Sequence, residues 1–252
     1  MGEKTDFMKI LQYMRLPAPP RSHEAELLDL PGHDMAALAE NLADLRAVDR
    51  LLGSSALTWR GLWPQLRARS RRRAYSLLDV ATGGAAGPQL LAEWAGRRGY
   101  SLRPVASDRL ADVLRLVRAG GARFPLIQHD ALHIPLPDRS VDFATCALAL
   151  HHFDPPQAAA LLRELARVAR CGLVVNDLQR SWPAYWGALL LARGPWRAMA
   201  RHDGPLSVRR AYTAAEARAL LAAAGLARAR VSTHFPFRML IVLEQASPAA
   251  EP

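Results

Sequence analysis

The sequence predicts an α/β protein built on a seven-stranded, mostly parallel sheet, with helices before the sheet and an antiparallel hairpin at its end. Three observations lead to this fold class. From Tyr75 onward, short apolar runs alternate with helical patterns, which is typical of βαβ units. A glycine-rich turn follows the first apolar run. The last two apolar runs have a short link and no helix between them, which favours an antiparallel hairpin.

The residues before the sheet divide into an irregular part and two helical parts. Residues 1–33 contain four prolines, which break any long helix. From Asp34 to Gly53, apolar residues recur at steps of three and four, so this stretch predicts an amphipathic helix with an Asp start and a Gly stop. Residues 56–73 predict a second helix that closes in an arginine run, and positive charge suits a helix C-terminus.

The sheet and its covering helices follow from the alternation after Tyr75. The expected strands cover residues 76–81, 103–107, 125–129, 141–148, 173–176, 229–233 and 238–245. The helical patterns between them cover residues 88–98, 112–118 and 156–170. A capping box from Thr213 to Glu216 opens a last helix, which ends at Gly225 before the hairpin.

Composition limits the classes of partner. The net charge is +10 and comes almost entirely from arginine, since only Lys4 and Lys9 are lysines. Such a balance attracts nucleic acid or an anionic membrane face. The arginines are scattered along the chain, however, which favours a solvated surface and a small-molecule partner over nucleic acid.

Cysteine usage and hydropathy predict a soluble, cytoplasmic protein. Cys146 and Cys171 are the only cysteines, and no C-x-x-C pattern occurs, so we predict no structural zinc and no disulfide framework. The N-terminus lacks the apolar core of a signal peptide. The longest apolar stretch, residues 184–192, is too short to cross a bilayer, which takes about 20 residues.

Acidic residues accompany the successive strands. Asp79 precedes a turn of small residues that lets a ligand approach the backbone, and Asp108 ends the second strand, where a carboxylate can accept hydrogen bonds from both ribose hydroxyls. Asp130 follows the third strand, and the fourth opens with Asp142 and ends at Leu148. We expect these acids at the carboxyl ends of their strands, where open α/β sheets bind ligands. Singly, each is more often a cap or turn residue; the ordered set points to a ligand.

The stretch 76–176 resembles the class I S-adenosylmethionine (SAM)-dependent methyltransferases, close to the UbiE/menaquinone-type and small-molecule O-methyltransferase branch. The turn Asp79-Val-Ala81-Thr-Gly83-Gly84-Ala85 and the segment 130–143 carry the resemblance. Ala81 and Ala85 replace two usual glycines, and alanine fits there if the backbone angles are ordinary, with a tighter cavity for the methionine end. The flanks 41–46 and 201–212 resemble methyltransferases found with bacterial type III polyketide synthases.

The resemblance implies a Rossmann-like fold, SAM as methyl donor and S-adenosylhomocysteine (SAH) as product. It implies that Asp108 holds the ribose, that Asp130 with Ala131 faces the adenine, and that Leu148 lines the methionine moiety. The expected cofactor-binding residues are Asp79, Ala81, Thr82, Gly83, Asp108, Arg109, Asp130, Ala131 and Leu148.

The expected organisation has three parts. Residues 1–73 form an N-terminal helical extension or lid, residues 74–246 form the SAM-binding domain, and residues 247–252 form a tail. Within the domain, residues 181–212 are an insertion at the place where this family carries its substrate lid. Its aromatic residues suit either an apolar, flat acceptor or packing against the N-terminal helices; they are Trp182, Tyr185, Trp186 and Trp196.

Histidines supply candidates for the acceptor chemistry. A phenol or enol acceptor must lose a proton, which a histidine near the methyl group can take. His151 and His152 follow the fourth strand directly, and His202 with Asp203 offers a base and its orienter in the insertion. We take His152, His202 and Asp203 as the candidate catalytic residues. The alternatives are that His152 packs against SAM and that the His202–Asp203 pair caps a turn.

The sequence therefore predicts a SAM-dependent methyltransferase that acts on a small apolar hydroxyl, with methylation of a quinol ring carbon as the second hypothesis. RNA methylation is a third, although the end of the fourth strand lacks the Asn/Asp-Pro-Pro-Tyr-type motif of adenine amino-methylating enzymes. A non-catalytic SAM-binding protein is a fourth, supported by Ala81 and Ala85. NAD chemistry would need G-x-G-x-x-G, which this turn does not supply. A homodimer stays open.

Overall fold

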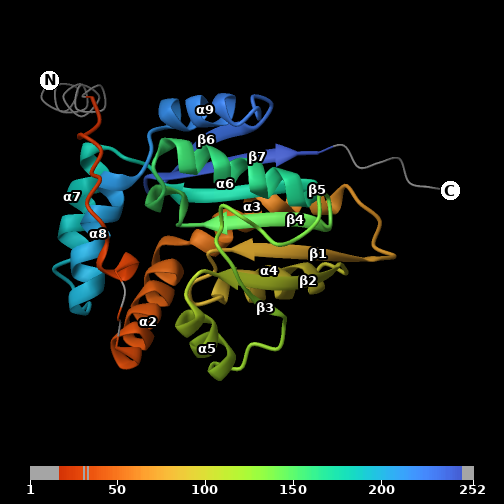
Figure 1. The fold of residues 1–252 in the computed structure, drawn as a ribbon, viewed down its shortest axis with the longest axis horizontal. Coiled ribbons are helices and arrows are strands. Elements are labelled where there is room, and N and C mark those ends of the chain that lie inside the picture. Colours follow the sequence, from red (N-terminus) through yellow and green to blue (C-terminus); the bar gives the residue numbers. More distant parts are fainter. Residues whose placement is uncertain (1–16, 31, 33, 246–252) are drawn as a thin grey trace, which may run out of the picture.

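A computed structural model describes residues 17–30, 32 and 34–245. The described chain forms a seven-stranded sheet in the order β3-β2-β1-β4-β5-β7-β6 (Figure 1). The strands are β1 (Ala74–Val80), β2 (Ser101–Asp108), β3 (Leu126–Gln128), β4 (Val141–Ala147), β5 (Ala169–Leu178), β6 (Arg230–His234) and β7 (Arg238–Glu244). The first five strands pair in parallel, while β7 is antiparallel to both β5 and β6. The predicted fold class, with its terminal hairpin, is confirmed.

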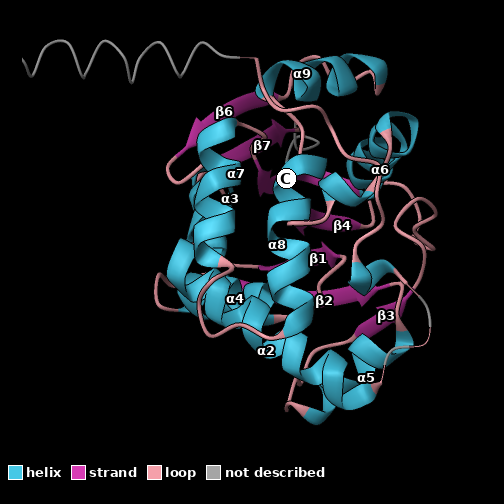
Figure 2. Ribbon diagram, turned by 90° about the vertical axis from the view of Figure 1, so that its left-hand side faces the viewer, coloured by secondary structure: helices cyan, strands magenta, loops and turns pink. Residues whose placement is uncertain are grey.

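Helices cover both faces of the sheet. They are α2 (Met35–Leu52), α3 (Ser54–Arg67), α4 (Ala86–Gly96), α5 (Ala111–Ala119), α6 (Pro155–Val168), α7 (Trp182–Leu191), α8 (Ala198–Arg210) and α9 (Ala214–Ala223). Figure 2 shows α3 and α4 on one side of the strands and α6 on the other. Adjacent residues of β1 accordingly face opposite layers, because side chains alternate along a strand: Leu77 packs in the layer of α3 and α4, and Leu78 in that of α6 and α9.

The helix termini follow the cap residues of the sequence. The Asp34 side chain accepts a hydrogen bond from the Ala37 amide, and α2 ends at Gly53 with a φ of 69°. The capping box of Thr213 and Glu216 also forms at α9. The helix expected over 56–73 is shorter in fact, because α3 ends at Arg67. The arginines that follow lie in the turn before β1, where Arg73 binds the carboxylate of Asp142 at 2.7 Å.

Asp142 corrects one sequence expectation. It lies near the start of β4, at the amino edge of the sheet, and its side chain is 1% exposed. Its carboxylate accepts hydrogen bonds from Arg73, Arg170 and the Ser76 amide. Burial opposes ionisation, but these donors hold the pKa of Asp142 well below its usual range. Asp142 therefore ties β1, β4 and β5 together and does not belong to a ligand site.

The carboxyl edge of the sheet is covered by segments that are far apart in the sequence. In Figure 1 the arrowheads of β1 and β4 point toward α2, α7 and α8. The short 3-10 helix η1 (Leu27–Asp29) contacts α8, and α8 also contacts α2. The insertion and the N-terminal segment thus meet over the strand ends. The tail at 247–252 and residues 1–16 of the predicted extension lie outside the described residues.

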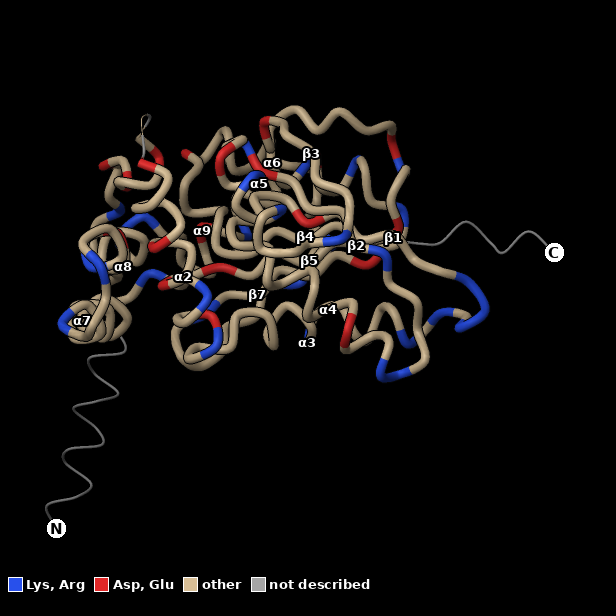
Figure 3. The backbone as a smooth tube through the Cα atoms, turned by 90° about the horizontal axis from the view of Figure 1, so that it is seen from below, with Lys and Arg blue, Asp and Glu red and all other residues tan. Residues whose placement is uncertain are grey.

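The surface charge and the helix lengths agree with the composition. Figure 3 shows Lys and Arg segments at both ends of the sheet, so that the basic residues do not gather along one face. None of the described helices combines the length and the apolar content that crossing a membrane requires.

Candidate functional site

A cavity of about 870 Å³ opens at the carboxyl edge of the sheet. This volume lies in the range of about 300–1,000 Å³ that small-molecule sites occupy. The strand order places β2 and β4 on opposite sides of β1, and the cavity lies at this switch point, where open α/β sheets bind their ligands. All nine residues expected at the cofactor line it: Asp79, Ala81, Thr82, Gly83, Asp108, Arg109, Asp130, Ala131 and Leu148.

The turn after β1 adopts a left-handed backbone at three positions. Gly83 has a φ of 49°, and Ala81 and Ala85 have φ values of 55° and 53°. Ordinary backbone angles were the condition under which alanine fits these two positions, and this condition is not met. Hydrogen bonds enforce this geometry: the Thr82 amide donates to the Ser107 carbonyl, and the Ala85 amide to the Thr82 carbonyl. The alanines reproduce the shape of a glycine turn at a conformational cost of about 1–2 kcal/mol each.

Asp79, near the end of β1, fixes the same turn through hydrogen bonds from two hydroxyl groups. Its buried carboxylate accepts hydrogen bonds from the hydroxyls of Thr82 and Thr145, both at 2.6 Å. Thr145 is available because it lies beside Asp79 in the β1–β4 register. Burial raises the pKa of Asp79 to about 6, against the effect of the two hydroxyls. Asp79 therefore positions the turn as well as lining the cavity.

Asp108 lies where the cofactor hypothesis requires an acid. One carboxylate oxygen accepts from the Gly83 amide and the other from the Leu110 amide, each at 3.0 Å. Burial raises the pKa of Asp108, although these amides oppose the shift. A carboxylate has about four acceptor positions, so Asp108 keeps capacity for a ligand diol. A Cβ added at Gly83 would meet no atom within 4 Å, so there is open space beside the turn. These features fit the ribose and methionine parts of SAM.

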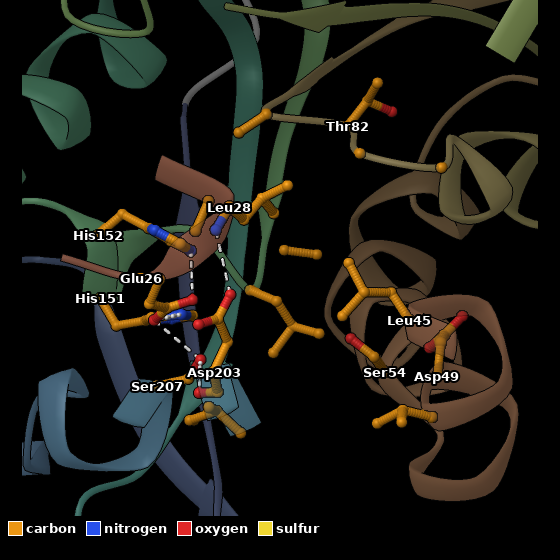
Figure 4. A pocket seen from close by; sticks show the side chains of 18 of the residues that line it. Glu26, Leu28, Leu45, Asp49, Ser54, Thr82, His151, His152, Asp203 and Ser207 are labelled. Carbon is orange, nitrogen blue, oxygen red and sulfur yellow. Dashed lines mark hydrogen bonds and ion pairs between the residues drawn. The ribbon is translucent and has the colours of Figure 1, made fainter. Parts of the chain in front are cut away.

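The other end of the cavity holds a cluster that the sequence only partly predicted. We call Glu26, Asp29, His151, His152 and Asp177 the acceptor cluster; the first four line the cavity, and Asp177 bonds His151 from behind it. Figure 4 labels Glu26 and the two histidines. The His151 Nδ1 is 2.7 Å from Asp177, and its Nε2 is 3.4 Å from Glu26. The His152 Nδ1 is 2.9 Å from Asp29, and its Nε2 is 3.7 Å from Glu26. Two imidazoles thus converge on one carboxylate.

The electrostatics of the acceptor cluster follow from its burial. Burial disfavours a charged His151, but Asp177 and Glu26 outweigh it and raise the pKa of His151 to about 10. Burial also disfavours a charged Glu26, yet His151, His152 and the Ser207 hydroxyl lower the pKa of Glu26 below its usual value. The cluster is therefore a concentrated set of charges inside a largely apolar cavity.

Asp203 and His202 form the predicted pair, but in an unexpected place. The His202 Nδ1 is 2.8 Å from the Asp203 carboxylate. That carboxylate also accepts hydrogen bonds from the amides of Leu27 and Leu28, which fixes the segment that carries Glu26. The His202 imidazole is 45% exposed and borders a separate shallow depression with Glu24. Asp203 thus lies in the cavity wall and positions Glu26, while His202 lies outside the cavity.

The acceptor end of the cavity is aliphatic more than aromatic. Of the four aromatic residues in the insertion, Trp196 lines the cavity, whereas Trp186 is 54% exposed and contacts Trp182 with its ring tilted by 40°. Small and aliphatic residues of α2 and α7 supply the wall: Leu45, Val48, Leu52, Ala184, Gly187, Ala188 and Leu191. The expectation of an aromatic wall is therefore correct for Trp196 alone.

Glu26, Asp29 and Asp177 were missed by sequence reasoning. Glu26 and Asp29 come from a stretch with no periodicity, and only the contact of η1 with α8 brings them to the site. Asp177 had a usable signal, because it lies one residue before the carboxyl end of a parallel strand, near the position that Asp108 has in β2. The expected fifth strand ends at Asn176 and therefore leaves Asp177 out.

The chain is similar to methyltransferases in both sequence and structure. Residues 78–174 match a family of proteins described as a methyltransferase domain. The demethylmenaquinone methyltransferase of Bacillus licheniformis is 28% identical over 110 residues, which cover 44% of this chain and 47% of that protein. The corresponding enzyme of Geobacillus stearothermophilus is 29% identical over 124 residues, which cover 48% of this chain and 52% of that protein. The chain spans about half the length of these curated relatives.

Solved structures share the fold at low sequence identity. Human N-acetylserotonin methyltransferase, in complex with SAM, aligns with a TM-score of 0.58 and 16% identity over 85% of this chain and 57% of that chain. The plantazolicin methyltransferase BamL, in complex with a desmethylPZN analogue and SAH, aligns with a TM-score of 0.55 and 16% identity over 79% of this chain and 77% of that chain. The CMeT domain of the citrinin polyketide synthase aligns with a TM-score of 0.53 and 14% identity over 70% of this chain and 48% of that chain.

The fold and the matched segment together define a class. The chain has the class I methyltransferase fold, with its turn and strand-end acids around one cavity. Residues 78–174 match a methyltransferase domain, and the described chain has the fold of class I methyltransferases. Two of the solved structures that share this fold are complexes with SAM or SAH.

Proposed function

We propose that the protein transfers the methyl group of SAM to an oxygen atom of a small apolar acceptor, an aromatic or polyketide-like hydroxyl compound. The observation that supports this most is the single cavity, which runs from the strand-end acids to the acceptor cluster. SAM supplies an electrophilic methyl group on a sulfonium. The chain's own residues bind the two reactants and align them, and alignment of this kind contributes much of the rate of a displacement.

The acceptor hydroxyl would lie against the acceptor cluster and lose its proton there. His152 is the more exposed of the two histidines. Its Nδ1 is 2.9 Å from Asp29, which leaves its Nε2, 3.7 Å from Glu26, for contact with the acceptor. Of the three catalytic candidates from the sequence, we retain His152 as a residue that contacts the acceptor and Asp203 as a positioning residue. We do not retain His202, because it lies outside the cavity.

Methylation of a quinol ring carbon is the second candidate. The curated relatives are named for demethylmenaquinone, and the aliphatic wall of α2 and α7 would suit an apolar ring with a hydrocarbon substituent. A cytoplasmic location, a homodimer, the role of residues 181–212 as a lid and the association with type III polyketide synthases remain predictions.

The test is to incubate the purified protein with methyl-labelled SAM and parallel panels of phenols, quinols, polyketide pyrones and bulk RNA. We expect label in a phenol or pyrone, at an oxygen identified by NMR of the product. Label at a quinol carbon would favour the second candidate, and label in RNA alone would refute a small-molecule acceptor. Calorimetry with SAH, run separately, tests cofactor binding without any acceptor.

A further inference from the structure

We propose that Glu26, His151 and His152 bind a divalent transition-metal ion, such as Zn²⁺, at the acceptor end of the cavity. One ligand atom from each residue lies within 4.8 Å of the other two. Glu26 and His151 are buried, His152 is partly buried, and all three line the cavity. The same three groups converge in Figure 4, where the carboxylate of Glu26 lies beside both imidazoles.

The distances in this group suit metal ligands better than hydrogen bonds. The Nε2 atoms of His151 and His152 are 3.4 and 3.7 Å from the carboxylate oxygens of Glu26. A nitrogen-to-oxygen hydrogen bond spans about 2.7–3.2 Å. Ligands that each lie about 2.0–2.1 Å from a tetrahedral zinc ion are roughly 3.3 Å apart. With the His151 Nε2 facing Oε1 of Glu26 and the His152 Nε2 facing Oε2, the three groups lie close enough together to share one ion.

Each histidine is also oriented as a metal ligand would be. The His151 Nδ1 bonds Asp177 at 2.7 Å, and the His152 Nδ1 bonds Asp29 at 2.9 Å. Metal-binding histidines generally donate the second ring N–H to a carboxylate, which fixes the tautomer and leaves the other nitrogen for the ion. Here both carboxylates fall on Nδ1, so both Nε2 atoms turn toward Glu26.

The charge around the group favours a cation. Glu26, Asp29 and Asp177 supply three carboxylates, and two guanidinium groups face them: Arg210 is 3.9 Å from both Glu26 and Asp29, and Arg238 lies near Asp177. With neutral histidines, the cluster carries a net negative charge inside a cavity.

The ligand set selects the kind of ion. Imidazole nitrogens favour Zn²⁺, Co²⁺, Ni²⁺ and Fe²⁺ over Mg²⁺ and Ca²⁺, and two histidines with one carboxylate leave at least one coordination position open. The cavity borders the group, so a ligand from the cavity can take that position. In the one step that rests on the proposed function, this ligand is the hydroxyl oxygen of the acceptor.

Metal binding is tested on untagged protein that has been stripped with a chelator and titrated with Co²⁺. We expect one Co²⁺ per chain, with a visible absorption band that Zn²⁺ displaces. His152→Ala and Glu26→Gln should weaken Zn²⁺ binding at least 100-fold, and Asp29→Asn about 10- to 100-fold through the lost orientation of His152. His202→Ala is the matched control, since its imidazole lies outside the cavity, and it should bind Zn²⁺ as the unchanged protein does.

Two results would overturn the site: no Co²⁺ band in the unchanged protein, or equal weakening by His202→Ala and His152→Ala. SAH affinity, measured on each variant by calorimetry, shows whether the fold is retained. Label transfer that a chelator leaves unchanged would refute the role of the ion in acceptor binding. Because metal binding is measured without an acceptor, failure of the site and failure of the proposed reaction give different results.

Discussion

Asp108 is held by two backbone amides, so that its remaining acceptor capacity has a fixed direction. We predict that Asp108→Ala weakens SAH binding by about 10- to 100-fold, because hydrogen bonds to a charged group contribute about 1.5–3 kcal/mol. Calorimetry measures the affinity directly. Asp112→Ala is the control, since this acid lies on α5 and pairs with Arg115 at the surface. Equal affinities in both variants would show that Asp108 does not hold the ribose.

Ala81 offers a second test at a single position. Its φ of 55° is costly for alanine and free for glycine, whereas glycine adds flexibility to the unfolded chain. Ala81→Gly should therefore leave the free energy of unfolding unchanged or raise it by up to about 1 kcal/mol. Ala219→Gly, at an exposed position inside α9, should lower it by about 0.5–1 kcal/mol. Urea unfolding compares the two; equal losses would mean that Ala81 is unstrained.

The site residues show what a sequence can reveal at this scale. Asp79, Asp108 and Asp130 were found because each belongs to a strand that its apolar run identifies. Glu26 and Asp29 were not, because their placement depends on the amides of Leu27 and Leu28 meeting Asp203, about 175 residues later. No local pattern encodes a contact of that range.

At the level of elements, Asp142 connects three strands through one carboxylate. Because its pKa is lowered in the folded state, its contribution to stability is present above the unfolded pKa of about 3.9 and is lost as the pH falls below that value. Asp142→Asn should lower the free energy of unfolding at pH 7 by about 1–3 kcal/mol. The difference between the variant and the unchanged protein should shrink as the pH falls below 4.

Asp79 changes the stability of the fold with pH in the opposite direction, so the experiment needs a comparison that cancels its effect. Its pKa of about 6 lies above the unfolded value, so the folded state takes up the proton first and gains stability as the pH falls from 7 toward 4. The unchanged protein alone would mix the two effects. Urea unfolding of the unchanged protein and of Asp142→Asn at each pH separates the effect of Asp142 from that of Asp79. A difference in the free energy of unfolding that stays constant down to pH 3 would contradict the assigned role of Asp142.

Most helices and strands of the structure could be predicted from the sequence. All seven strands were expected. The parallel strands β1, β4 and β5 are largely buried and carry continuous apolar runs, and the short link between β6 and β7 marked them as a hairpin. The boundaries failed where tertiary contacts decide them. The helical pattern of 156–170 ran past Val168, yet Ala169 already pairs with Val141 in the sheet. Likewise, the helical pattern of 56–73 includes the arginines after Arg67, but α3 ends at Arg67 and Arg73 forms an ion pair with Asp142 next to β1.

At the scale of the whole molecule, one cavity touches helices and strands from both ends of the chain, so a ligand in it should stabilise the entire fold. SAH at 100 times its dissociation constant should raise the free energy of unfolding by about 2.7 kcal/mol. For a domain of this size that corresponds to a rise of about 5–10 °C in Tm. Thermal unfolding with and without SAH measures the shift, and Asp108→Ala should lose most of it. A shift that Asp108→Ala retains in full would contradict a shared site.

The two ends of the cavity are drawn from different parts of the chain. The turn and the strand-end acids of the cofactor end belong to residues 78–174, which match the methyltransferase family, although Arg46 and Ser55 also line the cavity beside this turn. Glu26, Asp29 and Asp203 at the other end lie outside that segment. Of the acceptor cluster, only His151 and His152 lie within residues 78–174. Under the proposed function, we therefore expect the choice of acceptor to depend mainly on residues 17–30 and 177–210, which lie outside the segment that the family shares.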